Sequence, residues 1–488
     1  MPAIAYEITW DLGAGFVAMP GALGAEVELQ MTEGNTGLGW GNAAVPRATI
    51  RATAATVDAA WSYRPVKVRV SVDGGAFQDL FTGPLLEQED DGVSLRYTAG
   101  GMDVIIQRAP VRTPVRRRRP IATKTTATSN EDPDSGSPGW ANEVFWRGGG
   151  RPWDQRGSYP LSSTVLFYYI CDGSSVAPPA YCVDGDNAWE SLLLLAEAGA
   201  GQIYQDASGV MHFVNPLSFG ESAASPPHLT DSLATVPTGV PYGRLSRQAV
   251  VEGVISTAHA PFKVRGVQVM QQVYEDKTAY DIAPSASRDF ELAFQWPIAT
   301  HGNVTIEAST AQGVPTSVTP SIITTSGMRR VIRVTNPSST VGLIVHRIAA
   351  EGEPVSVVSE GTASFTGSSV GPFPAELRLP SNDAVQTYAD ARRWSRMAVR
   401  FFNSPRPVYS LSDLPYSPLL LPGAYALLTS ARRGLSSVGC RITRVQVERS
   451  GAKIASLSCV PLTGLPKLSD FLIIGNTYSD SDVRKMGY

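Results

Sequence analysis

Alternating apolar and polar residues predict a series of short strands near the start of the chain. Residues 66–72 alternate four valines with basic and hydroxyl side chains, the two-residue period of a half-buried strand. Asp-Gly-Gly at 73–75 suits a hairpin turn, and residues 77–83 provide a returning strand. Shorter runs of the same kind surround them. The pattern therefore predicts an all-β barrel or sandwich over residues 1–110.

A leucine-rich stretch in the middle of the chain predicts a helix. Asn187 is suited to cap it, and Glu190 follows three residues later, the spacing of a capping box. Residues 192–196 are strong helix formers. Gly199 and Gly201 are expected to end the helix, because glycine enters the left-handed region at little cost.

A hairpin is expected directly after this helix. Residues 202–205 and 210–215 flank Asp-Ala-Ser-Gly at 206–209, a composition typical of a turn. A helix docked on a hairpin forms a small packed unit, and this stretch carries no nucleophile, base or metal-ligand set.

A second helix is predicted at residues 381–402, with Ser381 or Asn382 as its cap and Asn403-Ser404-Pro405 as its end. The residues of its predicted packing face recur every three or four positions. They are Ala384, Tyr388, Ala391, Ser395, Ala398 and Phe402.

Two further regions are expected to be β. Residues 290–375 are rich in Thr, Ser and Val, with strand-like runs at a spacing that suggests a small β-sandwich. A scaffold role is favoured there over sugar binding, because aromatic residues are sparse between Trp296 and Phe365. Residues 406–465 alternate again, for example at 440–448.

Composition changes this picture little. The chain has 488 residues, too many for one ordinary core, so roughly three or four domains are expected. Charged residues make up only 17%, against 45 glycines and 36 prolines, which favours short strands and turns. A net charge of −3 gives no global basic field for nucleic acid. No apolar run approaches the about 18–20 residues of a membrane span, and nothing at the start marks the chain for secretion.

Residues 111–165 differ in character and predict a loop insertion rich in Arg, Gly and Pro, ordered only through neighbouring subunits. The run Arg116, Arg117, Arg118 and Arg119 lies within it. These arginines could face DNA in a channel or pair with acidic loops of a neighbour, such as residues 87–91. A solvated charge run is the plainer alternative.

Searching for catalytic and metal-binding motifs yields no site. The five histidines are scattered, and HExxH, GxSxG, P-loop and dinucleotide motifs are missing. The acidic pairs Glu89/Asp90 and Asp184/Asp186 are expected to be solvated loop residues, and the Asp184-Gly185-Asp186-Asn187 stretch lacks the remaining ligands of a calcium loop. The four cysteines form no CxxC or Cys/His set and are expected to be buried free thiols, although Cys440 and Cys459 could be cross-strand neighbours. We therefore expect no catalytic residue, no cofactor and no metal.

Three stretches resemble the hub proteins at the tail tip, or baseplate, of long-tailed (siphovirus-like) bacteriophages and phage-like particles. One is the order V-x-V-x-V-D-G-G…L-F-T-G-x-L within residues 68–86. Another is L-L-x-P-G followed by R-I-T-x-V-x-V within residues 405–465. The last lies on the leucine-rich helix and hairpin, where the matching residues are Trp189, Leu192, Ala196, Gly199, Gly201, Ile203, Tyr204, Asp206, Gly209 and Phe213.

This resemblance implies a mainly β chain with α+β parts: two small tail-tube-like β-barrels, a helix-plus-hairpin hub domain and a β-sandwich. The expected domains are a barrel at 1–110, the loop insertion at 111–165, a mixed α/β hub domain at 166–289, the sandwich at 290–375, a helix plus second barrel at 376–465 and a C-terminal arm at 466–488.

The resemblance also implies a virion structural role. Three chains with two barrels each would present six to a six-fold tail tube and match a three-fold tip. The implied partners are copies of itself in a homotrimer, the tail tube or distal tail protein, a tail fibre or spike, and the tape measure protein. DNA would be a partner only while it passes through the channel during genome ejection. The protein would also take part in host attachment. The protein would be made in the host cytoplasm and reside at the virion tail tip.

Two other functions stay open from the sequence. A tail-associated glycan hydrolase would need two close carboxylates in a deep cleft. A receptor-binding tail protein would use the 290–375 sandwich.

Overall fold

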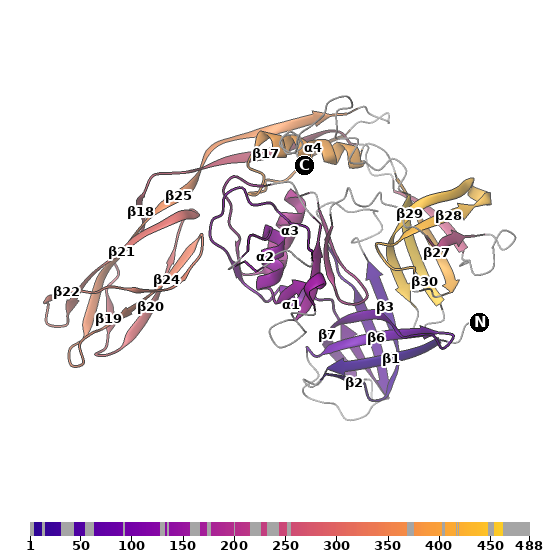
Figure 1. Cartoon of the computed structure of the whole chain (residues 1–488), viewed down its shortest axis with the longest axis horizontal. Helices are drawn as coiled ribbons and strands as arrows, with labels where there is room; N and C mark the ends of the chain where they lie inside the picture. The colour runs from indigo at the N-terminus through magenta and orange to yellow at the C-terminus, as the bar shows by residue number, and fades with distance from the viewer. Residues whose placement is uncertain are drawn as a thin grey trace.

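The computed structural model of the chain is shown in Figure 1. It describes residues 4–11, 15–30, 43–53, 63–90, 93–126, 132–133, 136–156, 166–172, 177–199, 201–214, 226–231, 244–250, 255–367, 375–402, 406–415, 417, 419–447 and 453–461. Strands predominate among them, so the expected mainly β class is confirmed. The expected C-terminal arm at 466–488 and the expected helix end at 403–405 lie outside the described residues.

The N-terminal strands form one antiparallel succession in the order β3-β5-β8-β7-β6-β1-β2. Val66, Val68 and Val70 of β6 are buried on one face, as the alternation predicts. The strands are β1 (Ile4–Asp11), β2 (Phe16–Ala18), β3 (Ala22–Gln30), β5 (Arg47–Thr53), β6 (Pro65–Val72), β7 (Gln78–Asp90) and β8 (Ser94–Ala99).

The strands near the C-terminal end continue the same sheet. Arg444–Val447 of β29 pair antiparallel with Val27–Gln30 of β3, and one apolar core contains side chains from both ends of the chain. We call this joint structure the terminal sheet. Its further elements are β15 (His228–Thr230), β16 (Arg244–Val250), β27 (Arg406–Pro415), β28 (Tyr425–Ser430), the 3-10 helix η4 (Ala431–Arg433), β29 (Leu435–Val447) and β30 (Lys453–Pro461).

The terminal sheet is open rather than ring-shaped among the described residues. Its main path runs from β16 through β27, β30, β29 and β3 to β2. β2 leads into β3 through Met19, Pro20 and Gly21 only, and Gly21 adopts a φ of 67° beside Thr53 of β5. The part of the path from β3 to β2 thus bends back toward β3, but no pairing between β2 and β3 closes it, and the two expected barrels stay a prediction.

The described residues between 101 and 214 form what we call the helical unit, at the centre of Figure 1. Its helices pack on a five-stranded sheet of order β10-β11-β14-β13-β4. The elements are α1 (Asp103–Ile106), β9 (Val111–Arg112), α2 (Trp140–Arg147), β10 (Gly150–Pro152), the 3-10 helix η1 (Trp153–Gln155), β11 (Phe167–Cys171), β12 (Asp184–Gly185), α3 (Ala188–Ala198), β13 (Gln202–Gln205) and β14 (Met211–Val214), with β4 (Ala43–Ala44) joining from outside.

The expectation that residues 111–165 form a loop ordered only by neighbouring subunits is wrong for residues 136–156. α2 lies there, and its Trp140, Val144 and Phe145 are fully buried within the chain's own core. Phe145 stacks on Tyr169 of β11, with ring centroids 5.1 Å apart. The apolar side chains of this short helix hold the segment in the core. The many Gly and Pro residues around the helix made the sequence look like a loop.

The helix and hairpin predicted after residue 186 are present as α3, β13 and β14. The Asn187 side chain accepts the backbone N–H of Trp189 and of Glu190, so the predicted cap is confirmed. The helix ends at Gly199, its C-cap, as predicted, but the expected left-handed conformation is wrong: Gly199 has a φ of −83°, and Gly201 is not among the residues of positive φ. A Cβ at Gly201 would come within 3.0 Å of the Phe213 ring, so close packing against the hairpin explains glycine there.

The remaining strands build a sandwich and a ribbon that carries it. Sheets β22-β21-β25, with β18 and β19, and β20-β24-β23 enclose one core. The strands are β17 (Ile255–Val267), β18 (Gln271–Asp276), β19 (Tyr280–Ile282), β20 (Ser287–Ala293), β21 (Ile298–Thr310), β22 (Pro315–Ser317), β23 (Ser321–Thr325), β24 (Arg329–Thr335), β25 (Leu343–Thr366) and β26 (Ala375–Arg378). The sandwich includes β18 and so extends before residue 290, the predicted start.

The ribbon is the pair formed by β17 and residues 355–366 of β25. β25 is 24 residues long and belongs to the sandwich at one end and to the ribbon at the other. Figure 1 shows the sandwich at the far end of this ribbon, away from the terminal sheet. Helix α4 (Tyr388–Phe402) covers the ribbon through Ala398 and Val399.

α4 begins seven residues later than predicted. The Thr387 hydroxyl accepts the backbone N–H of Asp390 at 3.0 Å and donates to the Asp390 carboxylate at 2.6 Å, a helix-capping arrangement. Asn382 instead donates its amide to Leu194 O and Glu197 at the end of α3. On the predicted face Ala391, Ser395 and Ala398 are buried, as expected, whereas Tyr388 is 51% exposed and the prediction is wrong there.

Candidate functional site

The arginine run divides into a buried and an exposed part. Arg119 is only 5% exposed and Glu143 of α2 is fully buried, and the two form an ion pair. The Arg119 guanidinium also donates to Pro138 O and lies 4.8 Å from the Trp140 ring centroid. Burial lowers the pKa of Arg119. Arg119 therefore stabilises the helical unit from inside, so it is not placed to touch DNA or a neighbour.

The other three arginines lie beside residues 178–181, to which the backbone N–H groups of Arg116 and Arg118 donate. Arg116 exchanges backbone hydrogen bonds with Tyr181, and its guanidinium donates to Pro133 O. Arg117 and Arg118 have exposed side chains. Of the four candidate contact residues, these two are the ones the structure leaves at the surface.

Ion pairs join the helical unit to the sandwich. The guanidinium nitrogens of Arg329 on β24 lie 2.8 Å from a carboxylate oxygen of Glu291, 3.4 Å from one of Asp184 and 3.9 Å from one of Asp186. Arg112 forms ion pairs with the same two aspartates. The expectation of solvated carboxylates is therefore wrong for Asp184, which is 13% exposed. The two aspartates of the calcium-like stretch are thus paired with arginine side chains. No group of three potential metal ligands occurs in the described part of the chain.

The turn between β23 and β24 completes this junction. Gly327 donates its backbone N–H to Thr113 O at 2.8 Å. A Cβ at Gly327 would lie 2.7 Å from the Cys182 sulfur. The close approach requires glycine, so the sandwich is fitted against the helical unit at this point.

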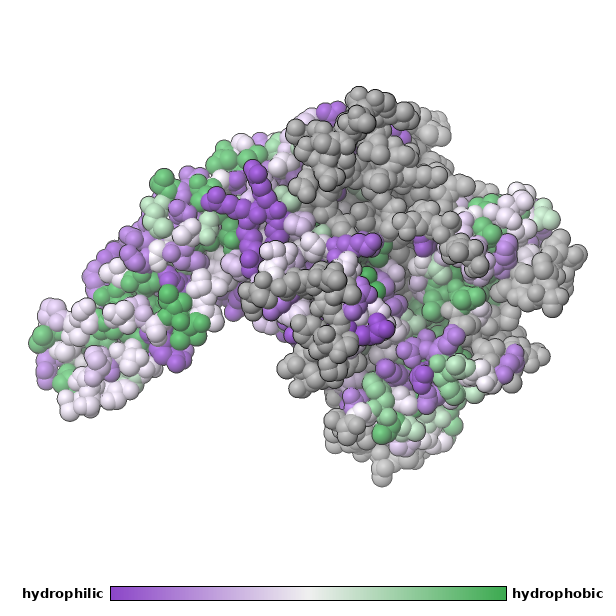
Figure 2. All heavy atoms as spheres, viewed as in Figure 1, coloured by the Kyte–Doolittle hydropathy of each residue, from purple (hydrophilic) through white to green (hydrophobic). Residues whose placement is uncertain are grey.

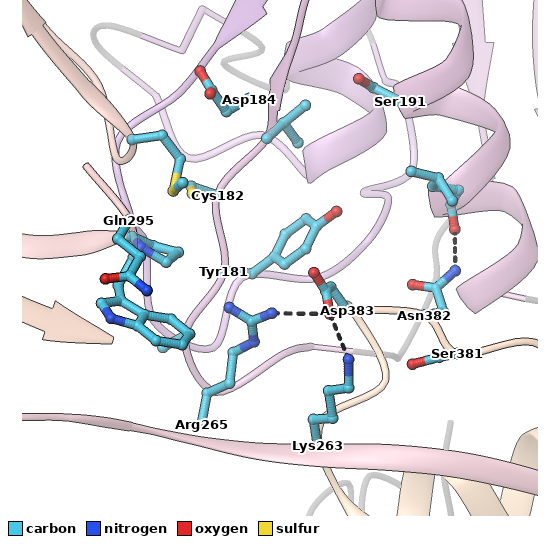
Figure 3. A pocket seen from close by; sticks show the side chains of 16 residues that line it. Tyr181, Cys182, Asp184, Ser191, Lys263, Arg265, Gln295, Ser381, Asn382 and Asp383 are labelled. Atoms are coloured by element: carbon cyan, nitrogen blue, oxygen red, sulfur yellow. Dashed lines mark hydrogen bonds and ion pairs between the residues drawn. The ribbon is translucent and has the colours of Figure 1, made fainter. Parts of the chain in front are cut away.

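A cavity of about 550 Å³ lies beside the junction (Figure 3). Four parts of the chain line it: the segment 180–184 with α3, the ribbon, the sandwich, and the loop before α4. Figure 3 shows Lys263 and Arg265 rising from β17, with Gln295 on one side and Asn382 and Asp383 on the other. None of these residues was singled out from the sequence as part of a binding site, since they come from segments that are far apart along the chain and form no motif.

Charges within the cavity are paired. The Asp383 carboxylate lies 2.9 Å from Arg265 and 3.8 Å from Lys263. Burial is the main reason why the pKa of the Cys182 thiol is raised to about 12, so this cysteine is held as the thiol. Tyr181, whose pKa is also raised by burial, packs edge-on against Trp140.

The cysteines otherwise behave as structural residues. All four are free. Cys440 and Cys459 are buried on neighbouring strands, but Cys440 lies opposite Pro461 and Cys459 opposite Ile442. The two are therefore diagonal rather than direct cross-strand partners.

Exposed apolar side chains occur on the ribbon, on the sandwich and in the connection between them, as they do elsewhere in the described part of the chain. On the face seen in Figure 2, hydrophobic patches alternate with hydrophilic ones over these elements. The exposed residues are Val269, Met270, Trp296, Val314, Ile322, Ile323, Val357 and Val358. None of the helices in the described part of the chain has the length and apolarity needed to span a bilayer.

Comparison with known proteins gives structural likeness without sequence likeness. No protein-family model matches the chain, and no curated protein matches its sequence. The fold is similar to that of a tail protein from Neisseria meningitidis MC58, with a TM-score of 0.46 and 8% identity over 94% of this chain and 98% of that one. It is also similar to the 43 kDa tail protein of prophage MuSo2 from Shewanella oneidensis, with a TM-score of 0.48 and 10% identity over 95% of this chain and all of that one. Both similar structures are thus named as tail proteins.

Proposed function

We propose that this protein is a virion structural protein, the hub that joins a six-fold tail tube to a three-fold tail tip of a bacteriophage or phage-like particle. The observation that supports it most is the terminal sheet. Strands from residues 4–99 and from residues 406–461 lie side by side on one core, so each chain presents two β units at one place. Three copies around an axis would present six.

The strand edges provide a means of assembly. β2 and β16 are the terminal strands of the main path of the terminal sheet, among the described residues. Unpaired edges accept strands from other chains, which natural proteins either block or use for association. In the proposed hub, edges of adjacent subunits pair and close the ring.

The ribbon and sandwich would extend from this ring toward neighbouring proteins. Their exposed apolar residues include Val269, Val314 and Val358, and these side chains would be covered by the neighbouring proteins. The sandwich would face a fibre or spike, and the opposite side the tail tube or distal tail protein. Contact with the tape measure protein belongs to the same proposal.

DNA would pass through the ring only in transit. Arg117 and Arg118 are the residues we propose as contacts with DNA or a neighbouring subunit, because their side chains are exposed while Arg119 is buried. No observation favours the hydrolase. Of the acidic pairs considered, Glu89 lies beside Arg96 and Asp184 beside Arg329.

The test is the assembly state of the purified full chain. Light scattering coupled to size-exclusion chromatography should give three copies, and electron microscopy should show a three-fold ring with six β lobes on one side. Antibody labelling of particles should mark one end of the tail. A chain that stays monomeric at high concentration and is missing from particles would contradict the proposal.

A further inference from the structure

We propose that the cavity between the ribbon, the sandwich and the helical unit binds a short saccharide. Trp296 provides the stacking surface, and Asp383 with Lys263 provides the hydrogen-bonding groups. This inference is independent of the hub function, since it concerns a site within one chain.

The size of the cavity suits such a ligand. Its volume of about 550 Å³ falls within the roughly 300–1,000 Å³ of typical small-molecule sites. Such sites combine apolar and aromatic walls with a few placed polar groups. Here Pro297, Met328 and Leu194 supply apolar surface and Gln295 supplies an amide.

The walls are held by hydrogen bonds from buried groups. The Gln386 side chain clamps the backbone of Ala180, donating to its carbonyl at 2.6 Å and accepting its N–H at 3.1 Å. Asn382 bonds to α3 and accepts the N–H of Ala384. Both polar groups of Asn382 are therefore used within the chain, and its role is to fix Asp383 beside it.

Trp296 is placed at the cavity by its neighbours. It lies in the short connection between β20 and β21, and this connection is anchored by three backbone hydrogen bonds. Phe294 N donates to Met328 O at 2.8 Å, Ile298 N to Gly327 O at 2.7 Å, and Val355 N to Pro297 O at 2.7 Å. The Trp296 side chain is nevertheless 43% exposed. An anchored, exposed indole beside a cavity offers a flat apolar face, which matches the C–H face of a sugar ring.

The charged groups favour a ligand rich in hydroxyls. Asp383 is 56% exposed although it is paired with Arg265, which is 12% exposed. An ionised carboxylate accepts about four hydrogen bonds and an ammonium group donates three, so Asp383 and Lys263 retain capacity for neighbouring hydroxyls. A purely apolar ligand would bury these charges without partners, at a cost in free energy. A phosphate would have to compete with Asp383 for both cations. A saccharide satisfies the groups without displacing either ion pair.

Binding would also hold the sandwich in place. Gln295, Trp296 and Met328 belong to the sandwich, whereas Tyr181 and Asp383 do not. A ligand in contact with both sides adds contacts across the junction and so stabilises the docked arrangement.

The experiment uses the full chain on an array of bacterial surface glycans: lipopolysaccharide O-antigens, capsular polysaccharides and peptidoglycan fragments. The strongest binder is then titrated as an oligosaccharide by calorimetry and by tryptophan fluorescence. The expected result is saturable binding that Trp296→Ala weakens at least tenfold. Asp383→Asn should weaken it as well, and Trp153→Ala, a tryptophan change outside the cavity, should leave it unchanged.

Circular dichroism and thermal melting establish that each variant is folded. Should Trp296→Ala fail to fold, Gln295→Ala and saturation-transfer NMR on the unchanged protein replace it. Absence of binding to every glycan class would overturn the proposal, as would binding that survives both Trp296→Ala and Gln295→Ala. A ligand that phosphate displaces, and whose binding leaves the tryptophan fluorescence of the protein unchanged, would identify an anion site and overturn the proposal too. None of these outcomes depends on the oligomeric state that tests the hub.

Discussion

Replacing Arg119 tests whether this part of the arginine run stabilises the fold or serves a partner. The Arg119 guanidinium is almost fully buried and paired with Glu143, which also pairs with Arg147 at 2.8 Å. Arg119→Ala removes this ion pair, a hydrogen bond to Pro138 O and the contact with the Trp140 ring. Arg117→Ala, two residues earlier, removes an exposed charge and is the matched control.

The expected loss follows from the charge left behind. Breaking a buried ion pair by removing one partner costs about 3–5 kcal/mol, because the other charge remains desolvated. Arg147 stays on Glu143 and offsets part of this cost, whereas loss of the cation–π contact adds about 0.5–2 kcal/mol. We expect Arg119→Ala to lower the free energy of unfolding by about 3–4 kcal/mol. Arg117→Ala should stay within about 0.5 kcal/mol of the unchanged protein.

The assay is urea unfolding followed by tryptophan fluorescence, which includes Trp140, together with circular dichroism. A double variant, Arg119→Met with Glu143→Met, should recover much of the loss, because replacing both charges with apolar side chains is often close to neutral. Equal midpoints for Arg119→Ala and Arg117→Ala would refute the buried ion pair and reopen Arg119 as a surface contact.

Four further substitutions, one of them a control, test other parts of the structure. Gly327→Ala places a Cβ 2.7 Å from the Cys182 sulfur and should cost about 1–3 kcal/mol by overpacking, seen as faster proteolysis of the ribbon. Gly342→Ala, with only ordinary contacts nearby, should behave as the unchanged protein, and equal proteolysis of both variants would contradict the close approach. Burial raises the pKa of Asp103 to about 6, so between about pH 4 and 6 the folded state keeps a proton that the unfolded state releases. The free energy of unfolding should therefore fall by about 3 kcal/mol as pH rises through that window, and Asp103→Asn should abolish this fall in urea midpoints measured from pH 4 to 7. Thr387→Ala should cost about 1 kcal/mol in the same assay, and an unchanged midpoint would exclude Thr387 as the α4 cap.

Local patterns predicted the elements whose signal is contained within a few residues. The alternation in β6 gave a strand whose valines are buried, and Asn187 caps α3 as its position before the leucine-rich run indicated. In both cases the structure depends on local features, the two-residue period in β6 and the capping hydrogen bonds of Asn187, which can be read from the sequence. α4 was placed too early because Asn382 resembles a cap, although its amide is used by α3, a contact 188 residues away in sequence.

The candidate site could not be predicted in the same way. Arg119 is buried because it pairs with Glu143, which lies 24 residues later on α2. This helix was not predicted, because glycines and prolines surround it in the sequence. The cavity residues come from separate segments, and no spacing rule links Trp296 to Asp383. The scarcity of aromatic residues between Trp296 and Phe365 favoured a scaffold role over sugar binding, and the exposure of Trp296 is visible only in the structure.

The pairing of β3 with β29 links folding of the terminal sheet to completion of the chain. Val27 and Leu29 of β3 are fully buried in a core that includes Val445 and Leu457, more than 400 residues later. Contacts this distant in sequence form only after a large loss of chain entropy, so the N-terminal strands can nucleate early but lack their cover until β29 and β30 are made. The open edges proposed for subunit pairing belong to the same sheet. A chain that is not yet fully synthesised therefore lacks the complete terminal sheet. Subunit pairing through these edges is then restricted to chains in which β3 has already paired with β29.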